Sequence, residues 1–179
     1  MRTGADLLRA VRAVPEADLA ETLRCGLSDL PNEVERAALV AALLTSSSSA
    51  DTPLVRELTR QEIVWVETND SGCGDVLLAC CWLLFMGGDV ADVPLVWRAK
   101  NVNFDAHCYI DSVFLVPEGV ASTAQFARSR GMTDLADWVD GMSVDELQGT
   151  VDAWRSGEFF DGAPLAAASA EELAAWMRQ

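Results

Sequence analysis

The chain is poor in positive charge. Its 179 residues include 13 lysine and arginine side chains against 28 aspartate and glutamate side chains, so the formal charge at pH 7 is −15. Phosphate backbones are bound mainly by lysine and arginine, and this charge therefore argues against a nucleic-acid partner. The same charge attracts cationic molecules and speeds their encounter with the protein. We expect a basic protein partner or a small-molecule ligand.

The chain also lacks a long apolar run. The longest run, Val76 to Met86, spans eleven residues, whereas a membrane-spanning helix needs about 20. The first residues include the charged Asp6 and build no uncharged apolar segment, so we expect no secretory signal peptide there. The five cysteines are odd in number and lack the spacing of zinc ligands. These features predict a reduced cytoplasmic protein with no membrane partner.

Common catalytic motifs are missing as well. The sequence contains no glycine-rich dinucleotide loop, no P-loop, no G-x-S-x-G elbow and no H-E-x-x-H motif. Nucleotide-dependent reactions and common hydrolytic reactions are therefore disfavoured. Because His107 is the only histidine, a zinc or iron site would need carboxylates for most of its ligands. We expect neither a metal nor a cofactor.

Most segments of the chain repeat their apolar residues at helical spacing. No segment alternates convincingly between apolar and polar residues as a half-buried strand does. Helix-start patterns occur at Asn32–Glu35, Thr52–Pro53 and Ser169–Glu172. The pattern predicts an all-α fold, either an irregular stack of antiparallel helical hairpins as in a short α-solenoid, or a compact helical bundle. The helix and loop lengths resemble those of HEAT-type hairpin stacks.

The expected organisation is one all-α domain over residues 1–179. Residues 1–45 form a candidate N-terminal helical subdomain, and residues 46–52 form the small polar loop that follows it. A second loop contains Phe159 and Phe160. These aromatic residues would either contact a partner or fold back over the C-terminal helix.

One short stretch, residues 97–111, holds the only lysine, the only histidine and the only tyrosine of the chain. Two interpretations of the surrounding residues 94–117 remain open: one continuous helix, or two helices with Asn103 capping the second. In both, His107 and Asp111 lie four residues apart on one helix face. The candidate site residues are Trp97, Arg98, Lys100, Asn103, Asp105, His107, Tyr109 and Asp111.

This stretch is the candidate catalytic site if the protein is an enzyme. Asp111 would orient and charge-stabilise the imidazole of His107 for acid–base chemistry. Lys100 would bind an anion or, if desolvated, form a Schiff base. The remaining candidates would line the pocket and bind the substrate. The alternative interpretation is structural: His107 and Asp111 form an ordinary surface pair, and their neighbours pack against or pair with adjacent helices.

Two functions follow from these observations. The first is an acidic cytoplasmic helical binding protein, of the adaptor or immunity type, that recognises a basic protein partner. The second is a small cofactor-independent enzyme that acts on a small molecule by acid–base or lysine chemistry at residues 97–111. Fold-level analogy places the binding protein first, because helical stacks commonly serve as binding surfaces.

Overall fold

The computed structural model describes residues 2–27, 31–69, 73–156, 158–159, 163–164 and 167–178. These residues form an all-α fold, which confirms the predicted fold class. The α-helices are α1 (Gly4–Arg12), α2 (Leu19–Cys25), α3 (Asn32–Ser46), α4 (Thr52–Asn69), α5 (Asp75–Gly87), α6 (Val93–Lys100), α7 (Phe104–Tyr109), α8 (Val120–Ser129), α9 (Thr133–Asp140), α10 (Val144–Ser156) and α11 (Ala170–Trp176).

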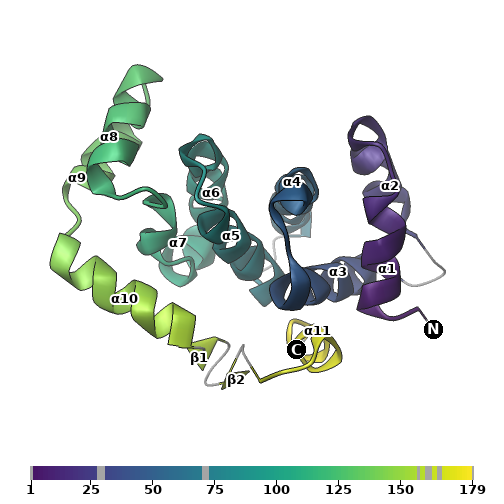
Figure 1. The fold of residues 1–179 in the computed structure, drawn as a ribbon. Helices are drawn as coiled ribbons and strands as arrows, with labels where there is room; N and C mark the ends of the chain where they lie inside the picture. The colour runs from purple at the N-terminus through teal and green to yellow at the C-terminus, as the bar shows by residue number, and fades with distance from the viewer. Residues whose placement is uncertain are drawn as a thin grey trace.

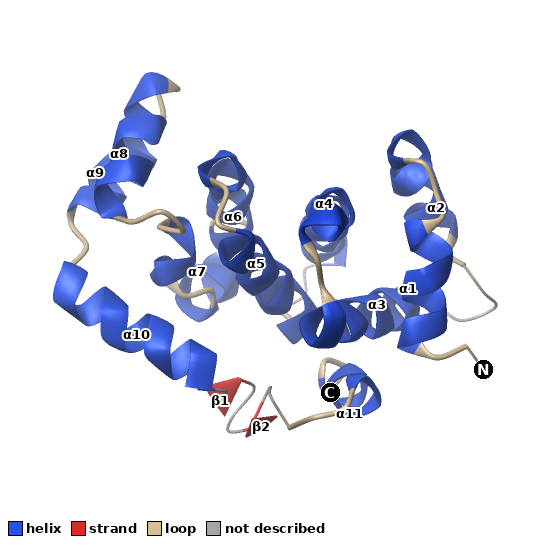
Figure 2. Ribbon diagram, viewed as in Figure 1, coloured by secondary structure: helices blue, strands red, loops and turns tan. Residues whose placement is uncertain are grey.

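Short elements connect these helices. The 3₁₀-helices are η1 (Glu16–Asp18), η2 (Ser49–Asp51), η3 (Val90–Asp92) and η4 (Ser112–Leu115). Two short strands, β1 (Glu158–Phe159) and β2 (Ala163–Pro164), pair in antiparallel orientation. Figure 2 shows that helix makes up most of the ribbon and that both strands lie between α10 and α11.

The helices cross the molecule and the chain then returns. In Figure 1, α1 and α2, then α4, then α5 and α6, then α8 and α9 follow one another from right to left. Helix α3 lies below α4 in this view, and α10 leads back along the lower side toward α11. Helix α11 contacts both α3 and α1, so the last helix packs against the first part of the fold.

Helix α3 is the central element of this arrangement. It contacts α1, α2, α4, α5 and α11. Its alanine-rich sequence lets neighbouring backbones come close, and Leu39, Val40 and Leu43 are fully buried. Helix α5 contacts α3 and α4 and is buried along its length, from Val76 to Phe85. A helix that is apolar on all sides belongs in the interior, as the apolar run in the sequence predicts.

The packing of α1 on α3 depends on a glycine. A Cβ added to Gly4 would lie 2.5 Å from the carbonyl oxygen of Ala38. This distance is far shorter than a van der Waals contact, so the first turn of α1 has room for a hydrogen atom at this point and for nothing larger.

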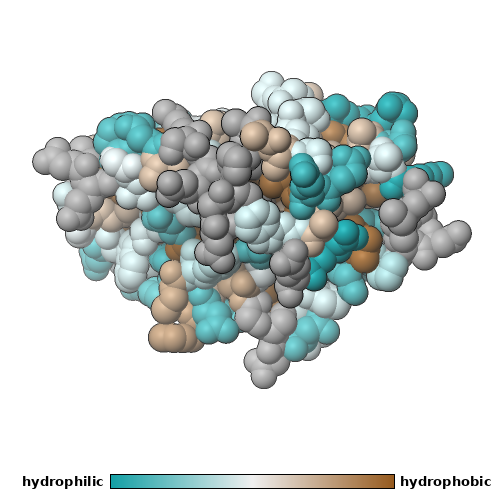
Figure 3. All heavy atoms as spheres, turned by 90° about the horizontal axis from the view of Figure 1, so that it is seen from below, coloured by the Kyte–Doolittle hydropathy of each residue, from teal (hydrophilic) through white to brown (hydrophobic). Residues whose placement is uncertain are grey.

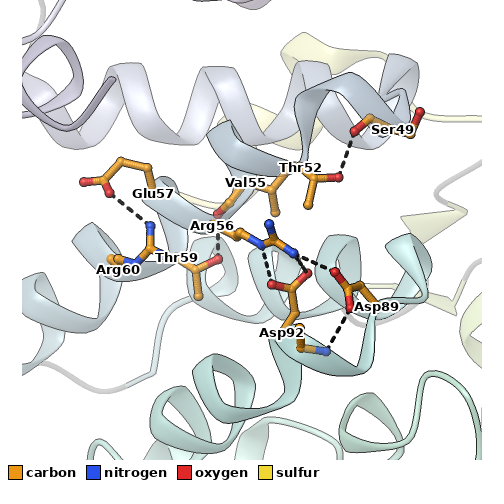
Figure 4. Close-up of polar contacts among 10 residues, drawn as sticks. Ser49, Thr52, Val55, Arg56, Glu57, Thr59, Arg60, Asp89 and Asp92 are labelled. Carbon is orange, nitrogen blue, oxygen red and sulfur yellow. Dashed lines mark hydrogen bonds and ion pairs between the residues drawn. The ribbon is translucent and has the colours of Figure 1, made fainter. Parts of the chain in front are cut away.

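Ion pairs join segments that are distant in the sequence. The Arg12 guanidinium donates to both carboxylate oxygens of Asp51 at 2.8 Å and thereby ties the end of α1 to η2. This pairing lowers the pKa of the buried Asp51. Figure 4 shows a second set, in which Arg56 of α4 reaches Asp89 and Asp92 at η3.

Two of the three helix-start patterns behave as predicted. Helix α4 begins at Thr52, and Ser169 forms a capping box with Glu172. The expected Asn32–Glu35 capping box is wrong, because Pro31 is the N-cap of α3. Glu35 is instead buried, and its Oε2 accepts from the backbone N–H of Leu27 at 2.6 Å. The carboxylate thus stabilises the preceding loop and does not cap the N-terminus of α3.

The outer surface is mixed in character. On the face seen from below, hydrophobic residues form small separate areas among hydrophilic ones, as far as the coloured atoms of Figure 3 show. Across the part of the chain that the structure describes, no helix combines the length and the apolarity that crossing a membrane requires.

The close approach at Gly4 gives a test of the α1–α3 packing. We expect Gly4→Ala to destabilise the protein by about 1–3 kcal/mol, because the added methyl group forces α1 away from α3. The matched control is Gly149→Ala in α10, where an added Cβ meets no atom of the described residues within 4 Å. There the helix propensity of alanine should stabilise the fold by up to about 1 kcal/mol. Urea unfolding of both variants measures the difference, and equal effects would contradict the packing account.

The Arg12–Asp51 pair predicts a pH dependence. Asp51→Asn should lower the free energy of unfolding by about 1–3 kcal/mol at pH 7. Because the folded pKa of Asp51 is lowered, this stabilisation is complete above the ordinary value of about 4 and is lost as the pH falls through the lowered value. Unfolding curves of wild type and variant should therefore begin to approach each other below about pH 4 and should coincide only once the pH lies below the lowered pKa. Asp134→Asn, at an exposed position of α9, should follow wild type throughout.

Candidate functional site

The candidate stretch at residues 97–111 folds as two helices and a turn. Helix α6 ends at Lys100, and the side chain of Asn103 caps α7 by accepting from the N–H of Ala106 at 2.7 Å. Helix α7 ends at Tyr109, because the next residue, Ile110, is extended and turns its side chain fully into the core. The two-helix interpretation is therefore confirmed.

The expected pairing of His107 with Asp111 on one helix is wrong. Asp111 lies beyond the end of α7, where its Oδ1 accepts from the N–H of Val113 at 3.0 Å and begins η4. Its Oδ2 accepts from the indole N–H of Trp154 at 3.0 Å. Asp111 thus joins the turn after α7 to α10, and its orientation is set by these two donors.

Lys100 holds the end of α7. Its Nζ donates to the carbonyl oxygens of His107 and Ile110, both at 2.6 Å, and the residue is only 4% exposed. Burial lowers the pKa of Lys100, and the negative charge of Asp111 opposes this shift. A cation at this place satisfies carbonyl groups that the short helix leaves without partners, and it interacts favourably with the helix dipole.

His107 belongs to a group of aromatic side chains. Its Nδ1 lies 3.2 Å from Oδ1 of Asn101, and its ring meets the ring of Trp138 edge-on at a centroid distance of 5.2 Å. Trp97 packs against the same Trp138 ring at 5.8 Å. The Nζ of Lys100 lies 5.7 Å from that ring centroid, so α9 covers the end of α6 and the side of α7 through this one indole.

The other predicted pocket residues point to different partners. Arg98 donates to Glu67 of α4 at 3.1 Å, and the hydroxyl group of Tyr109 donates to Asp75 of α5. Asp105 is exposed. The structure therefore distributes these side chains around α6 and α7 and does not gather them in one cavity.

A shallow pocket of about 380 Å³ lies beside α7, lined by Cys73, Asp105, Cys108 and Tyr109. Burial, reinforced by the charges of Asp75 and Asp105, raises the pKa of Cys73 to about 12. The Cys73 thiol is therefore protonated at neutral pH and is a poor nucleophile. Among the described residues, no group of three or more histidine, cysteine or acidic side chains is placed to hold a metal ion.

Two features of the surface were not assigned by the sequence analysis. Phe104 is 79% exposed and Trp138 is 39% exposed. A groove between α2, α3 and α4 is lined by arginines and by Trp65. The predicted role of the Phe159–Phe160 loop lies outside the side chains that the structure describes.

Comparison of the chain with protein-family models, with curated proteins and with solved structures found no match. The function is therefore inferred from the residues of this chain.

The role of Lys100 as a helix cap can be tested by removing its charge. We expect Lys100→Met to lower the free energy of unfolding by about 1–3 kcal/mol, because it leaves the carbonyl groups of His107 and Ile110 without a donor in a buried place. The control is Arg98→Met in the same helix, which removes an exposed ion pair and should cost less than about 1 kcal/mol. Chemical unfolding measures both, and a Lys100 variant as stable as the control would contradict the capping role.

Proposed function

We propose that the protein is a non-catalytic helical binding protein that recognises a basic protein partner through the outer surface of α7 and α9. We name this the α7–α9 surface and define it by Phe104, Asp105, Asp134, Asp137 and Trp138. The observation that carries the proposal is that two large aromatic side chains are exposed here among carboxylates.

The aromatic residues supply anchors. Phe104 is the most exposed large hydrophobic side chain of the described residues, at 79%. It lies three residues before His107 on α7, so the two share a helix face, and the ring of His107 contacts Trp138. Exposed aromatic residues are typical of protein–protein contacts, where they contribute most of the binding energy.

The carboxylates supply the preference for a basic partner. Asp134 lies four residues before Trp138 and on the same face of α9, while Asp105 and Asp137 are next to the two aromatic residues in the chain. Within the described residues, these three aspartates form no ion pair, whereas Asp140 pairs with Arg128. A cationic partner would therefore find unpaired carboxylates around the anchors, which favours its association.

Binding is favoured over catalysis by what the rare polar residues do. Lys100 and Asp111 bond to backbone groups, and His107 lies between Asn101 and Trp138. An acid–base mechanism needs a base and its orienting group in contact, and these side chains have other partners. The net charge of −15 favours a protein partner over nucleic acid. Free thiols at all five cysteines fit a reducing cytoplasmic setting.

The experiment is a comparative capture from native lysate with wild type, Phe104→Ala and Met86→Ala as bait. Phe104→Ala should weaken the complex at least about 30-fold, the effect of losing one central aromatic anchor. Met86 is 50% exposed on α5, so its truncation removes an apolar side chain away from the α7–α9 surface and should change nothing. The partner should be basic and should dissociate as salt rises from about 50 mM to about 500 mM.

Three outcomes would contradict the proposal. They are a captured protein that is acidic, a complex that is insensitive to salt, and a complex that survives Phe104→Ala unchanged. The proposal is also contradicted if wild type captures no protein at all, or if Phe104→Ala captures every protein that wild type captures.

A further inference from the structure

A second binding feature lies at the other end of the molecule from α9. It is a groove of about 500 Å³ between α2, α3 and α4, and in Figure 1 these helices lie on the side opposite α8 and α9. A volume of this size suits a small organic molecule. The groove is lined by Ala20, Arg24, Asn32, Arg36, Glu57, Arg60, Gln61, Val64, Trp65, Thr68 and Asn69.

The groove carries positive charge in an acidic protein. Three arginines line it, Arg24, Arg36 and Arg60, and Glu57 is the one acid among the described lining residues. Glu57 of α4 is largely buried and pairs with Arg60 at 3.3 Å (Figure 4). Arg24 is exposed and makes no ion pair with a described residue. The whole chain has 13 basic residues and 28 acidic ones. Among the residues that line the groove, basic side chains outnumber acidic ones.

Arg36 is the buried member of this set and has an unused donor. It is 5% exposed, and its Nε donates to Glu62 of α4. Its Nη2 is buried and has no hydrogen-bond partner among the residues that the structure describes. A buried guanidinium N–H without an acceptor costs free energy. An acceptor oxygen on a ligand that enters beside it would remove this cost.

Trp65 and Val64 form an apolar wall in the same groove. Val64 is 52% exposed and Trp65 is 38% exposed, and the guanidinium of Arg36 lies 5.4 Å from the ring centroid of Trp65. This contact holds the indole beside the arginines. The groove thus combines a flat aromatic surface with several donors for an anion, which matches a ligand that has an aromatic ring and an acidic group.

We propose that this groove binds small aromatic carboxylates. The ring packs against Trp65 and Val64, and the carboxylate accepts charge-assisted hydrogen bonds from the arginines. This inference is independent of the proposed protein partner, because the groove and the α7–α9 surface share no residue.

The test is a titration of the full chain with 2-naphthoate, followed by two-dimensional amide and indole NMR. We expect saturable shifts at residues of α2, α3 and α4 and at the indole N–H of Trp65. The neutral analogue 2-naphthamide should bind at least about tenfold more weakly, because it lacks the charge that the arginines recognise.

Variants separate specific binding from general attraction. Arg24→Gln and Arg60→Gln change exposed side chains, so the fold is retained, and each should weaken 2-naphthoate binding about tenfold. Arg9→Gln makes the same change of net charge on exposed α1, outside the groove, and should leave the affinity unchanged. The proposal is overturned if 2-naphthoate causes no saturable shift at millimolar concentration. It is also overturned if the shifts fall outside α2–α4, if the amide binds equally well, or if all three variants behave alike.

Discussion

The buried ion pair between Arg36 of α3 and Glu62 of α4 sets the geometry on which much of the structure depends. Both side chains are less than 10% exposed. Burial raises the pKa of Glu62, and the guanidinium of Arg36 opposes that shift. Removing two charges from water is expensive, and losing one partner would leave the other uncompensated in the interior. The pair therefore holds α4 in one position on α3, which also contacts α1, α2, α5 and α11.

Polar side chains also satisfy buried polar groups at the other end of the fold. Lys100, Asn103 and Asp111 each satisfy backbone groups at helix ends, and Asp111 also holds the indole of Trp154. Short helices such as α7 leave a large share of their N–H and C=O groups without helical partners. These side chains were candidates for catalysis because polar residues of their kind are rare in the chain. In the structure they complete the hydrogen bonding of an irregular helical stack. Their concentration in one stretch of sequence reflects the short elements of that stretch.

Local patterns predicted the fold class because helix formation and burial of one face are local properties. The apolar periodicity indicated the helices, and the continuous run at Val76–Met86 indicated the buried α5. The end of α7 before Ile110 was not predicted. Ile110 lies four residues after the buried Ala106, which is also the spacing of a continuing helix, so the sequence gives no sign that the helix stops there. Asn32–Glu35 carried a capping pattern, but Glu35 found a donor in Leu27 of the preceding loop.

The surface features were harder to predict because they depend on tertiary packing. Trp138 occupies a position typical of the core, yet α9 lies at the edge of the stack, so its indole covers Lys100 and His107 with one side and leaves the rest exposed. The arginine-lined groove combines residues of three consecutive helices, and no spacing in any one of them indicates it. Whether residues 1–45 behave as a subdomain stays a prediction.

The packing of α11 on α3 has a consequence for synthesis in the cell. The ribosome makes the chain from its N-terminal end, at about 5–20 residues per second. Helix α3 leaves it before α11, and one side of α3 stays uncovered until all of the chain between Ser46 and Ala170 has been made and α11 has emerged. During those seconds the nascent chain exposes an alanine- and leucine-rich helix, a surface of the kind that chaperones bind. The helical core around α3 is thus closed by a helix that is made well after α3 itself.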